Sequence, residues 1–357
     1  MQPTCDDGFS LVELLIATAL TVSLTGAVVS LVGPSATSSP VLAESIDLTE
    51  RARVAGDQLL EDLSRAGAGI SAGPHAGALV EAFAPVVPRR MGLNGADPPT
   101  VARQDAITIR YVPDTRSQTA VATFTPAPAA LMTVAGGPGC PAGPACGLAA
   151  GADVFVFDDE GHADTFTITQ VQANVLTLQP HDAAPFQYGP GARVAEAVSR
   201  TFYLDAAQRQ LRMYDGNQSD LAVVDHVVGL SFSYFGDPNP PQAPRPPLGT
   251  ANCLFDAAGQ LDPSIVVLPS QSGALVPLAP AMFTDGPWCG SGAARFDADL
   301  LRVRQVRVTL RVEAALPAFR AAGPAFAHPG TSTSALSALP DVGLTLDVSP
   351  RNLNLKR

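Results

Sequence analysis

Few residues in this sequence have the types and spacing that catalysis requires. It contains no P-loop, no H-E-x-x-H zinc motif and no G-x-G-x-x-G after a strand-like run. The histidines are scattered, and His226 stands in an apolar stretch that favours a core or edge position over a catalytic base. We therefore predict no catalytic residue, no metal site and no cofactor, and we expect that the protein is not an enzyme.

Two clusters of oxygen-bearing side chains have a composition that calcium favours. Residues 215–220 are Asp-Gly-Asn-Gln-Ser-Asp, and residues 158–161 are Asp-Asp-Glu-Gly. Neither has the full ligand spacing of a calcium-binding loop. Both lie between strand-like runs, so we predict a simple hairpin turn at each.

The cysteines carry the remaining chemistry. The sequence has Cys5, Cys140, Cys146, Cys253 and Cys289, and four of these remain if the first eight residues are removed. The four lie in Gly- and Pro-rich segments that favour disulfides over free buried thiols, and no Cys-x-x-Cys spacing suggests zinc. We predict the bonds Cys140–Cys146 and Cys253–Cys289, because loops between nearest neighbours close most easily.

The N-terminal region holds one carboxylate in a long uncharged stretch. From Phe9 to Val32 the only charged residue is Glu13, and about 20 apolar residues are enough to cross a bilayer. Gly33 and Pro34 break helices, so we expect the membrane segment to end there. A secretory signal peptide and a plain signal-anchor are alternatives. The first usually has a basic leader and a shorter apolar core, and the second gives the costly Glu13 no purpose.

The residues around this carboxylate resemble the processing motif of type IV pilins and type II secretion pseudopilins. The motif is the run Gly8-Phe9-Ser10-Leu11-Val12-Glu13-Leu14-Leu15-Ile16-Ala17. In that family a prepilin peptidase cuts after the glycine, the new terminal phenylalanine is N-methylated, and the glutamate pairs with the terminal amine of a neighbouring subunit. Gly8, Phe9 and Glu13 match these positions, but the leader has Asp6 and Asp7 where the family usually has Lys or Arg.

Two further segments resemble PilW-like minor pilins. One is the run Leu-Glu-Asp-Leu-Ser-Arg-Ala-Gly at 60–67, and the other is the C-terminal segment 344–353, where an Arg-Asn pair follows a strand-like run. The resemblance covers about the first 67 residues and the last ten or so. For the middle of the chain, the expected structure is based on strand patterns alone.

We therefore expect an α+β, pilin-like fold, in which a long N-terminal helix with a transmembrane first half packs on a β-rich head with long loops. Pro34 and Pro40 predict a kink or break in the helix, and Gly67 and Gly69 predict its end. The expected parts are a leader peptide at 1–8, a transmembrane helix at 9–33, an amphipathic helix at 34–68 and the head at 69–357, with a Pro-rich insertion at about 237–293.

Strand signals dominate the expected head, where β-branched and aromatic residues alternate with turn formers. The arginines at 302, 304, 307 and 311 predict a strand with one solvated face. The insertion begins with a Pro-rich run that favours extended chain without ladder pairing, so we expect a surface excursion tied by a cysteine bridge. The candidate strands are 106–112, 120–125, 154–157, 165–171, 175–178, 200–204, 210–214, 223–235, 303–312 and 344–348.

Composition and charge exclude some classes of partner. Only 15% of residues are charged, the net charge is −11, and no block of Lys or Arg occurs. Nucleic-acid binding and attraction of the head to an anionic membrane surface are therefore disfavoured. The many turn formers, 31 Gly and 33 Pro, fit a β-rich body with long loops.

The resemblance implies a structural minor subunit of a type IV pilus that acts in assembly or initiation at or near the tip. A minor pseudopilin of a type II secretion system is an alternative, and a pilus-borne adhesin is an alternative of another class. The implied location is the inner membrane, with a single pass and a periplasmic head. The implied partners are prepilin peptidase, other minor and major pilins or pseudopilins, the inner-membrane assembly platform and membrane lipid.

Overall fold

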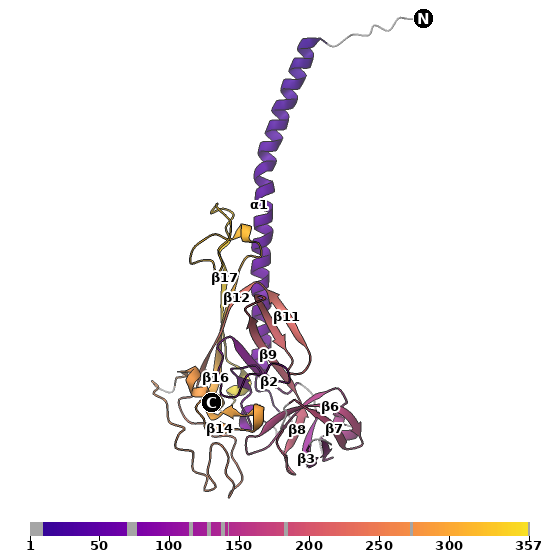
Figure 1. Ribbon diagram of the computed structural model, residues 1–357, viewed down its shortest axis with the longest axis vertical. Helices are drawn as coiled ribbons and strands as arrows, with labels where there is room; N and C mark the ends of the chain where they lie inside the picture. Colours follow the sequence, from indigo (N-terminus) through magenta and orange to yellow (C-terminus); the bar gives the residue numbers. More distant parts are fainter. Residues whose placement is uncertain are drawn as a thin grey trace, which may run out of the picture. The chain divides into compact units, whose positions relative to one another are not determined.

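The computed structural model has an N-terminal helix followed by a β-rich body, which confirms the expected α+β class in this coarse form (Figure 1). Contacts divide the chain into two compact units. We call Met1–Glu50 with Glu313–Asp341 the stem unit, and Arg51–Val312 with Val342–Arg357 the head unit. The structure describes residues 10–69, 77–113, 117–126, 130–136, 140, 141, 143–181, 185–271 and 274–355, without the side chains of 31–39.

A single α-helix, α1, runs from Leu11 to Arg65. Its 55 residues continue through Gly33, Pro34 and Pro40, so the expected break in the helix is wrong, whereas the expected kink and the expected end of the membrane segment stay predictions. Each proline removes one backbone N–H donor, whereas every flanking turn keeps its own hydrogen bonds and propagates the helix. The predicted stop is confirmed, because Gly67 has a φ of 75° just beyond the last turn.

The head unit contains a five-stranded antiparallel sheet that supports the last turns of α1. Ala55, Leu59 and Leu63 of the helix are completely buried in this unit, as expected for the apolar face of a half-buried helix. The strands follow the order β1 (Val86–Val87), β2 (Ala106–Tyr111), β9 (Val198–Asp205), β10 (Gln210–Tyr214) and β11 (Asp220–Asp225).

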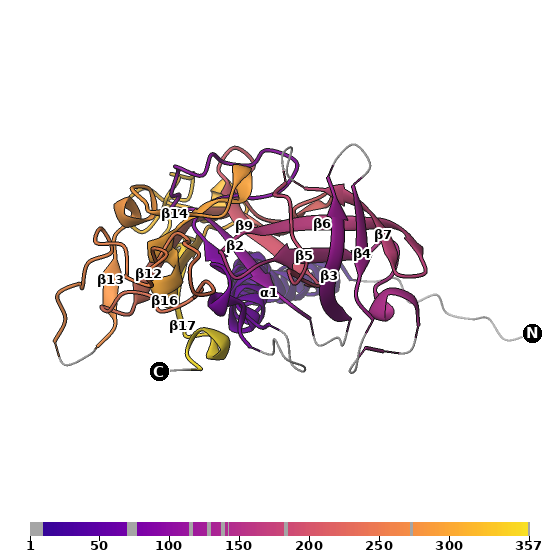
Figure 2. The ribbon, with the colours of Figure 1, turned by 90° about the horizontal axis from the view of Figure 1, so that it is seen from below.

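A closed barrel is inserted between two neighbouring strands of that sheet (Figure 2). Strands β2 and β9 pair directly, from Ala106↔Tyr203 to Tyr111↔Val198, and the chain between them forms the barrel. The barrel strands, in their order around it, are β3 (Gln118–Thr125), β4 (Leu131–Val134), β7 (Val175–Pro180), β6 (Ala163–Gln172), β5 (Asp153–Phe157) and β8 (Arg193–Glu196).

Alternation along β5 explains how the barrel packs on the rest of the head unit. Val154 and Val156 belong to the barrel core, together with Phe166 and Leu176. Phe155 and Phe157 point the other way, and both rings lie edge-on to Phe83, at 5.6 and 5.5 Å between ring centroids. Successive strand residues face opposite sides of a sheet. Strand β5 therefore contributes side chains both to the barrel core and to the packing around Phe83 outside the barrel.

A four-stranded antiparallel sheet completes the head unit. A two-stranded ribbon lies between two of its strands, β13 and β16, in the sequence. The sheet has the order β13 (Val276–Leu278), β12 (Val227–Gly236), β16 (Val303–Val312) and β17 (Val342–Val348), and the ribbon pairs β14 (Trp288–Cys289) with β15 (Phe296–Asp297). All ten candidate strands correspond to observed strands, but the candidate at 223–235 is two strands. His226 has a φ of 60° between β11 and β12, where the chain leaves one sheet for the other.

Two expectations about the head unit are wrong in part. Arg302 does not lie on a solvated strand face, because it precedes β16 and is 1% exposed, although alternation holds along the strand itself. The Pro-rich insertion is more than a surface excursion, since it supplies the edge strand β13 and the buried side chains of Leu254 and Phe283. Its first part, 238–249, forms no ladder, as expected.

The stem unit joins α1 to a long excursion, Glu313–Asp341, that connects β16 to β17. The fully buried carboxylate of Glu313 accepts hydrogen bonds from Arg320 and from His328 Nδ1, each at 2.8 Å. The amide of Ala315 donates to the Glu44 carboxylate on α1 at 2.6 Å. The excursion is therefore organised around the buried acid Glu313 and attached to the helix by the half-buried Glu44.

Candidate functional site

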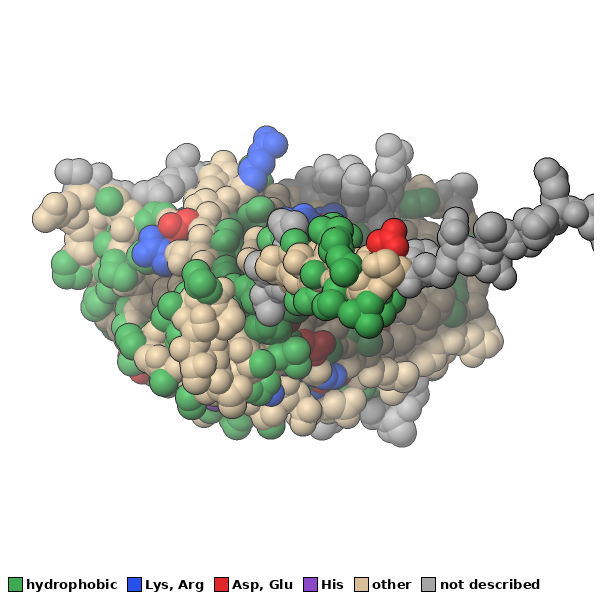
Figure 3. Space-filling model, turned by 90° about the horizontal axis from the view of Figure 1, so that it is seen from above, with side chains coloured by type: hydrophobic (Ala, Val, Ile, Leu, Met, Phe, Trp, Pro, Cys, Tyr) green, Lys and Arg blue, Asp and Glu red, His purple; other side chains and the backbone are tan. Residues whose placement is uncertain are grey.

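The first part of α1 is long and apolar enough to cross a membrane. The candidate span is Leu11–Ser30, 20 residues, and none of it is buried within the protein. A helix from the core of a soluble protein would be mostly buried, so the exposure favours a lipid or protein partner for this surface. Figure 3 looks onto the N-terminal end of the helix and shows mostly hydrophobic side chains there.

Hydroxyl side chains within this span bond back to the helix backbone. Thr18, Thr21, Thr25 and Ser30 donate to carbonyl oxygens three or four residues earlier, at 2.7 to 2.9 Å. A hydroxyl satisfied in this way costs little in a bilayer. These four hydroxyl side chains therefore do not oppose membrane insertion.

Glu13 lies in the first turn of α1 and is solvent-exposed in the single chain. Its Oε2 accepts a hydrogen bond from the Ser10 amide at 3.2 Å, while Ser10 Oγ accepts one from the Val12 amide at 3.2 Å. This reciprocal arrangement is a capping box, which satisfies two N–H groups that a helix start leaves unpaired. Glu13 therefore has a role within its own chain besides any pairing with another.

The other two residues of the processing motif, Gly8 and Phe9, lie outside the described residues. Of the three residues, the structure describes only Glu13. The cleavage between Gly8 and Phe9 stays a prediction.

The four remaining cysteines occur in two pairs at disulfide-bonding distance. Cys140 lies against Cys146, and Cys253 lies against Cys289, which is the pairing expected from loop length. The second pair joins two parts of the Pro-rich insertion, because Cys289 belongs to β14 near its end. Non-reducing peptide mapping should recover both linked pairs, and free thiols at all four positions would remove the case for an oxidising compartment.

A buried ion pair fixes α1 to the five-stranded sheet. Asp62 is completely buried and accepts two hydrogen bonds from Arg200 of β9, at 2.7 and 3.0 Å, and one from the Tyr111 hydroxyl of β2 at 3.1 Å. From its residue type, Asp62 belongs to the polar face of the amphipathic helix expected at 34–68, so its complete burial differs from that expectation. Spacing of four and three residues from Ala55 through Leu59 to Asp62 was the available signal that it lies on the buried face.

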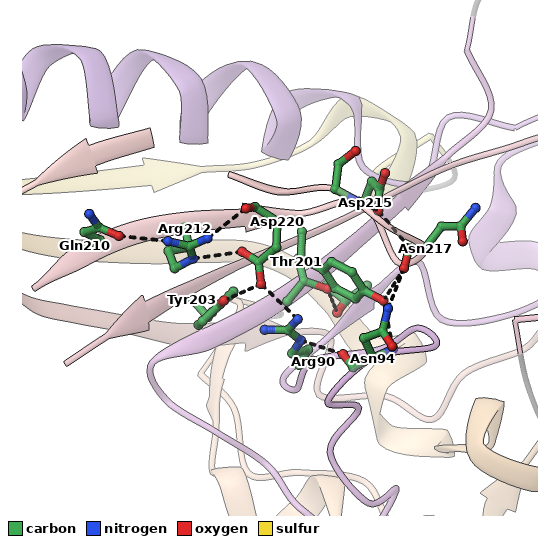
Figure 4. Close-up of polar contacts among 12 residues, drawn as sticks. Arg90, Asn94, Thr201, Tyr203, Gln210, Arg212, Asp215, Asn217 and Asp220 are labelled. Atoms are coloured by element: carbon green, nitrogen blue, oxygen red, sulfur yellow. Dashed lines mark hydrogen bonds and ion pairs between the residues drawn. The ribbon is translucent and has the colours of Figure 1, made fainter. Parts of the chain in front are cut away.

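A second polar network covers the strands β9, β10 and β11 (Figure 4). The Arg90 guanidinium packs over the rings of Tyr203 and Tyr214, and it donates to Asp220 at 3.0 Å. Asp220 also accepts from the Tyr203 hydroxyl and from Arg212, at 2.6 and 2.9 Å. Burial alone would raise the pKa of Asp220, but these donors hold it below its ordinary value. The carboxylate is saturated with donors, which makes it a clamp for the Arg90 segment rather than a base.

Both acidic turns form the hairpins expected of them. Asp215 Oδ1 accepts from the amides of Asn217 and Ser219 between β10 and β11, and Asp158 Oδ1 accepts from the amides of Glu160 and His162 between β5 and β6. Turn amides thus engage one carboxylate in each loop.

Among the described residues, two groups of side chains have the geometry to hold a metal ion. They are Asp158, Glu160 and His162, and Asp285, Asp297 and Asp299. In the first group Asp158 is bonded to His162 Nδ1 at 2.8 Å, and in the second Asp297 accepts from the amides of Gly286 and Asp299. Each group has a structural explanation in its own loop, so neither argues for a metal.

A groove of about 620 Å³ opens in the head unit beside the Pro-rich insertion. Pro240, Pro241 and the half-exposed Leu355 line it, together with Arg304, which pairs with Asp237 at 2.7 Å. This mixture of apolar side chains and paired charges suits binding better than chemistry.

One string in the sequence fits a catalytic pattern. Residues 69–73 are Gly-Ile-Ser-Ala-Gly, which matches G-x-S-x-G. The nucleophile elbow needs a strand before the serine and a helix after it, whereas here α1 precedes the string. Ser71 itself lies outside the described residues, so the string adds no argument for an enzyme.

Comparisons with protein-family models, with curated proteins and with solved structures found no significant match.

Proposed function

We propose that this chain is a pilin-like structural subunit, a minor subunit of a type IV pilus that acts in assembly or initiation. One observation carries the proposal. The unburied span Leu11–Ser30, with Glu13 as its only charged residue, belongs to the same continuous helix that is fixed to a β-rich head by Asp62. A helix that anchors in lipid and also carries a folded head is what a filament subunit requires.

The competing explanations of the N-terminus account for less. A secretory signal peptide needs no continuation into the folded body, whereas α1 runs on for 35 residues beyond Ser30 and ends inside the head unit. In a plain anchor the carboxylate would serve only the helix cap, which a neutral glutamine could serve without a charge that costs several kcal/mol in the membrane by order of magnitude. A subunit that pairs this charge with a neighbour's terminal amine explains both features.

A minor pseudopilin of a type II secretion system is the closest alternative, because it would use the same helix and head. The groove beside the Pro-rich insertion favours a second role, in which the head of an assembled subunit binds a ligand as an adhesin does. If the purified chain binds a ligand but does not assemble into filaments, the result would support the adhesin role and not the structural one.

Intact-mass measurement on protein extracted from membranes tests the proposal. Cleavage between Gly8 and Phe9 leaves 349 of 357 residues and removes Asp6 and Asp7, so the net charge changes from 22 − 33 = −11 to 22 − 31 = −9. We expect this mass plus one methyl group. Gly8→Leu should block cleavage and leave the full-length mass, because a side chain there obstructs the protease cleft. A mature N-terminus beyond residue 20 would instead identify an ordinary signal peptide.

A further inference from the structure

The groove in the head unit takes part of its lining from the Pro-rich insertion and part from the barrel. Residues 239–243 of the insertion line it, and so do Phe157 of β5 and Arg193 of β8. The two barrel residues are fixed, because their strands pair directly and the Arg193 guanidinium lies over the Phe157 ring at 4.8 Å. Residues 239–243, which we call the wall, belong to no strand. The position of the wall therefore depends on what holds its two ends.

A buried arginine fixes the first end of the wall. Arg302 is 1% exposed, and its Nη1 donates to the carbonyl oxygen of Pro238 at 3.0 Å. The same oxygen accepts from the Leu268 amide at 2.8 Å. The chain therefore enters the wall from a point that two donors hold in place.

The second end of the wall lies against a turn of the barrel and a disulfide. Pro244 follows the wall and is buried, and its carbonyl oxygen accepts from Asn252 Nδ2 at 2.9 Å. A Cβ placed on Gly161, in the turn between β5 and β6, would lie 3.5 Å from Pro244 Cγ and 3.5 Å from Cys253 Sγ. The end of the wall, the barrel turn and the Cys253–Cys289 bond thus meet at one place.

This bond connects the end of the wall to a part of the head unit that is fixed independently. Cys289 is 1% exposed and belongs to β14, which pairs with β15. Between these two strands, the carbonyl oxygens of Ala293 and Arg295 accept from the buried Arg89 at 3.1 and 2.6 Å. Cys253 lies outside the sheets and the ribbon. Cys289 is therefore the anchored partner, and Cys253 is the partner that the bond holds.

We propose that the Cys253–Cys289 bond is a strap that holds the wall against the barrel, so that the groove has its observed shape only in the oxidised chain. The bond joins residues 36 positions apart, and breaking it restores the freedom that closure of this loop removed. A dithiol breaks the bond by giving two hydrogens to its sulfurs, which become thiols, while the dithiol becomes a cyclic disulfide. Any binding in the groove then depends on the redox state of the compartment.

Hydrogen exchange of the full chain in detergent, followed by mass spectrometry, tests the strap. The amides of Asn252, Leu254 and Phe255 are hydrogen-bonded within the segment that carries Cys253. Dithiothreitol should accelerate their exchange at least about ten-fold, while the amides of β16 keep their protection. Equal exchange with and without dithiothreitol would overturn the proposal. Faster exchange in β16 as well would show that the bond supports the whole head unit, and it would overturn the assignment to the groove.

Two double variants identify the bond that is responsible. Cys253→Ser combined with Cys289→Ser should show the fast exchange at 252–255 without dithiothreitol. Cys140→Ser combined with Cys146→Ser is the matched control, because that bond joins residues only 6 positions apart, between β4 and β5. The control should be protected at 252–255 until dithiothreitol is added. If it exchanges fast from the start, the strap is not the bond that protects this segment.

A crystal structure of the variant without the strap provides a measurement at the wall itself. Residues 239–244 displaced from Gly161, or absent from the electron density, support the proposal. The same residues in their present position would show that Arg302 and Asn252 hold the wall without the bond, and the proposal would be wrong. Neither measurement needs a ligand or a filament, so the strap stands or falls apart from the proposed function.

Discussion

The attachment of α1 to the head unit depends on a carboxylate that has lost all contact with solvent. Asp62 is surrounded by the side chains of Arg200 and Tyr111, and together they satisfy both of its oxygens. Such a pair contributes little net stability over an apolar substitute, but removing one partner leaves an uncompensated buried charge. The pair of Asp62 and Arg200 therefore fixes where the helix lies on the sheet, and it contributes little to the free energy of unfolding.

Asp62→Ala should lower the free energy of unfolding by about 1–3 kcal/mol, because Tyr111 and Arg200 would be left without their acceptor, although the Arg200 side chain is 31% exposed and can reach solvent. Asp57→Ala is the matched control on the same helix, since Asp57 forms only an exposed pair with Arg53. Its expected cost is below about 1 kcal/mol. Urea unfolding of the full chain in detergent measures both, and equal losses would show that Asp62 is not the anchor.

A second buried carboxylate predicts how stability varies with pH. Asp297 is completely buried, and desolvation, with a smaller contribution from Asp299 and Asp285, raises its pKa from 3.8 to about 6. The folded state therefore binds an extra proton between these two pH values. Stability from this group is greatest below about pH 4 and decreases as the pH rises through about 6.

Tm measured from pH 4 to pH 6.5 should fall with rising pH, and Asp297→Asn should remove most of that slope. Asp256→Asn is the control, because Asp256 is an exposed turn residue of the Pro-rich insertion and likewise accepts from backbone amides. It should leave the slope unchanged even if it shifts the whole curve. A wild-type Tm that rises over this range would contradict the assignment to Asp297.

At the scale of elements, α1 and β17 approach each other closely at a glycine. A Cβ on Gly56 would lie 2.5 Å from Leu344 Cδ2 and 3.7 Å from Leu346 Cδ1. Glycine costs about 1 kcal/mol relative to alanine inside a helix, so its presence here is explained by the approach of the strand. The same helix has open space at Gly26, where no atom lies within 4 Å of a Cβ.

Gly56→Ala should therefore change the stability of the head unit by less than about 1 kcal/mol, because the new methyl group meets the flexible end of the Leu344 side chain and the cost of moving it offsets the gain in helix propensity. Gly26→Ala should be neutral or slightly stabilising. Gly56→Ala should be more favourable in a Leu344→Ala background than in the wild-type chain, since the strand side chain then no longer meets the new methyl group. A double-mutant cycle measured by urea unfolding checks this, and additive losses would mean that the two residues do not interact.

The elements that sequence predicted are those with long periodic runs. Val303–Val312 alternates apolar and polar residues over its whole length, and α1 shows helical spacing up to Gly67, so both were identifiable. Strands such as Leu131–Val134 and Arg193–Glu196 have four residues each and no clear alternation, and they were missed. The barrel was missed with them, because ring closure depends on which strands pair, and local sequence carries little information about long-range pairing.

In the candidate site, too, local features were predictable from the sequence and long-range contacts were not. Glu13 and the membrane span were visible from sequence, because one charge in a long apolar run is a local signal. The meeting of Asp62 with Tyr111 and Arg200 was invisible, since these residues come from a helix and two strands separated by up to 138 positions. Their partners are set by the pairing of β2 with β9 and by the insertion of the barrel between them.

At the scale of the whole molecule, the proposed function requires one helix to do two things. Leu11–Ser30 offers its whole surface to lipid or to other helices, and the last turns of α1 are buried in the head unit. A subunit of this kind can leave the membrane for a filament only if the Glu13 charge is compensated there. The capping box does not provide that, because amides satisfy hydrogen-bonding capacity without supplying a positive charge.

Glu13→Gln separates the cap from the charge. Glutamine still accepts from the Ser10 amide, so α1 should begin normally, insert in the membrane and be cleaved after Gly8. The pairing with a neighbour's terminal amine is lost, and we expect co-purification with partner pilins and surface or periplasmic filaments to be abolished. Crosslinking and pull-down of the head-tagged chain from cells measure this. Ser10→Ala is the control, because it weakens the cap at the Val12 amide but keeps the carboxylate, and it should assemble. If Glu13→Gln assembles as well as the wild-type chain, the carboxylate does not set the pairing between subunits and its role is confined to the helix start.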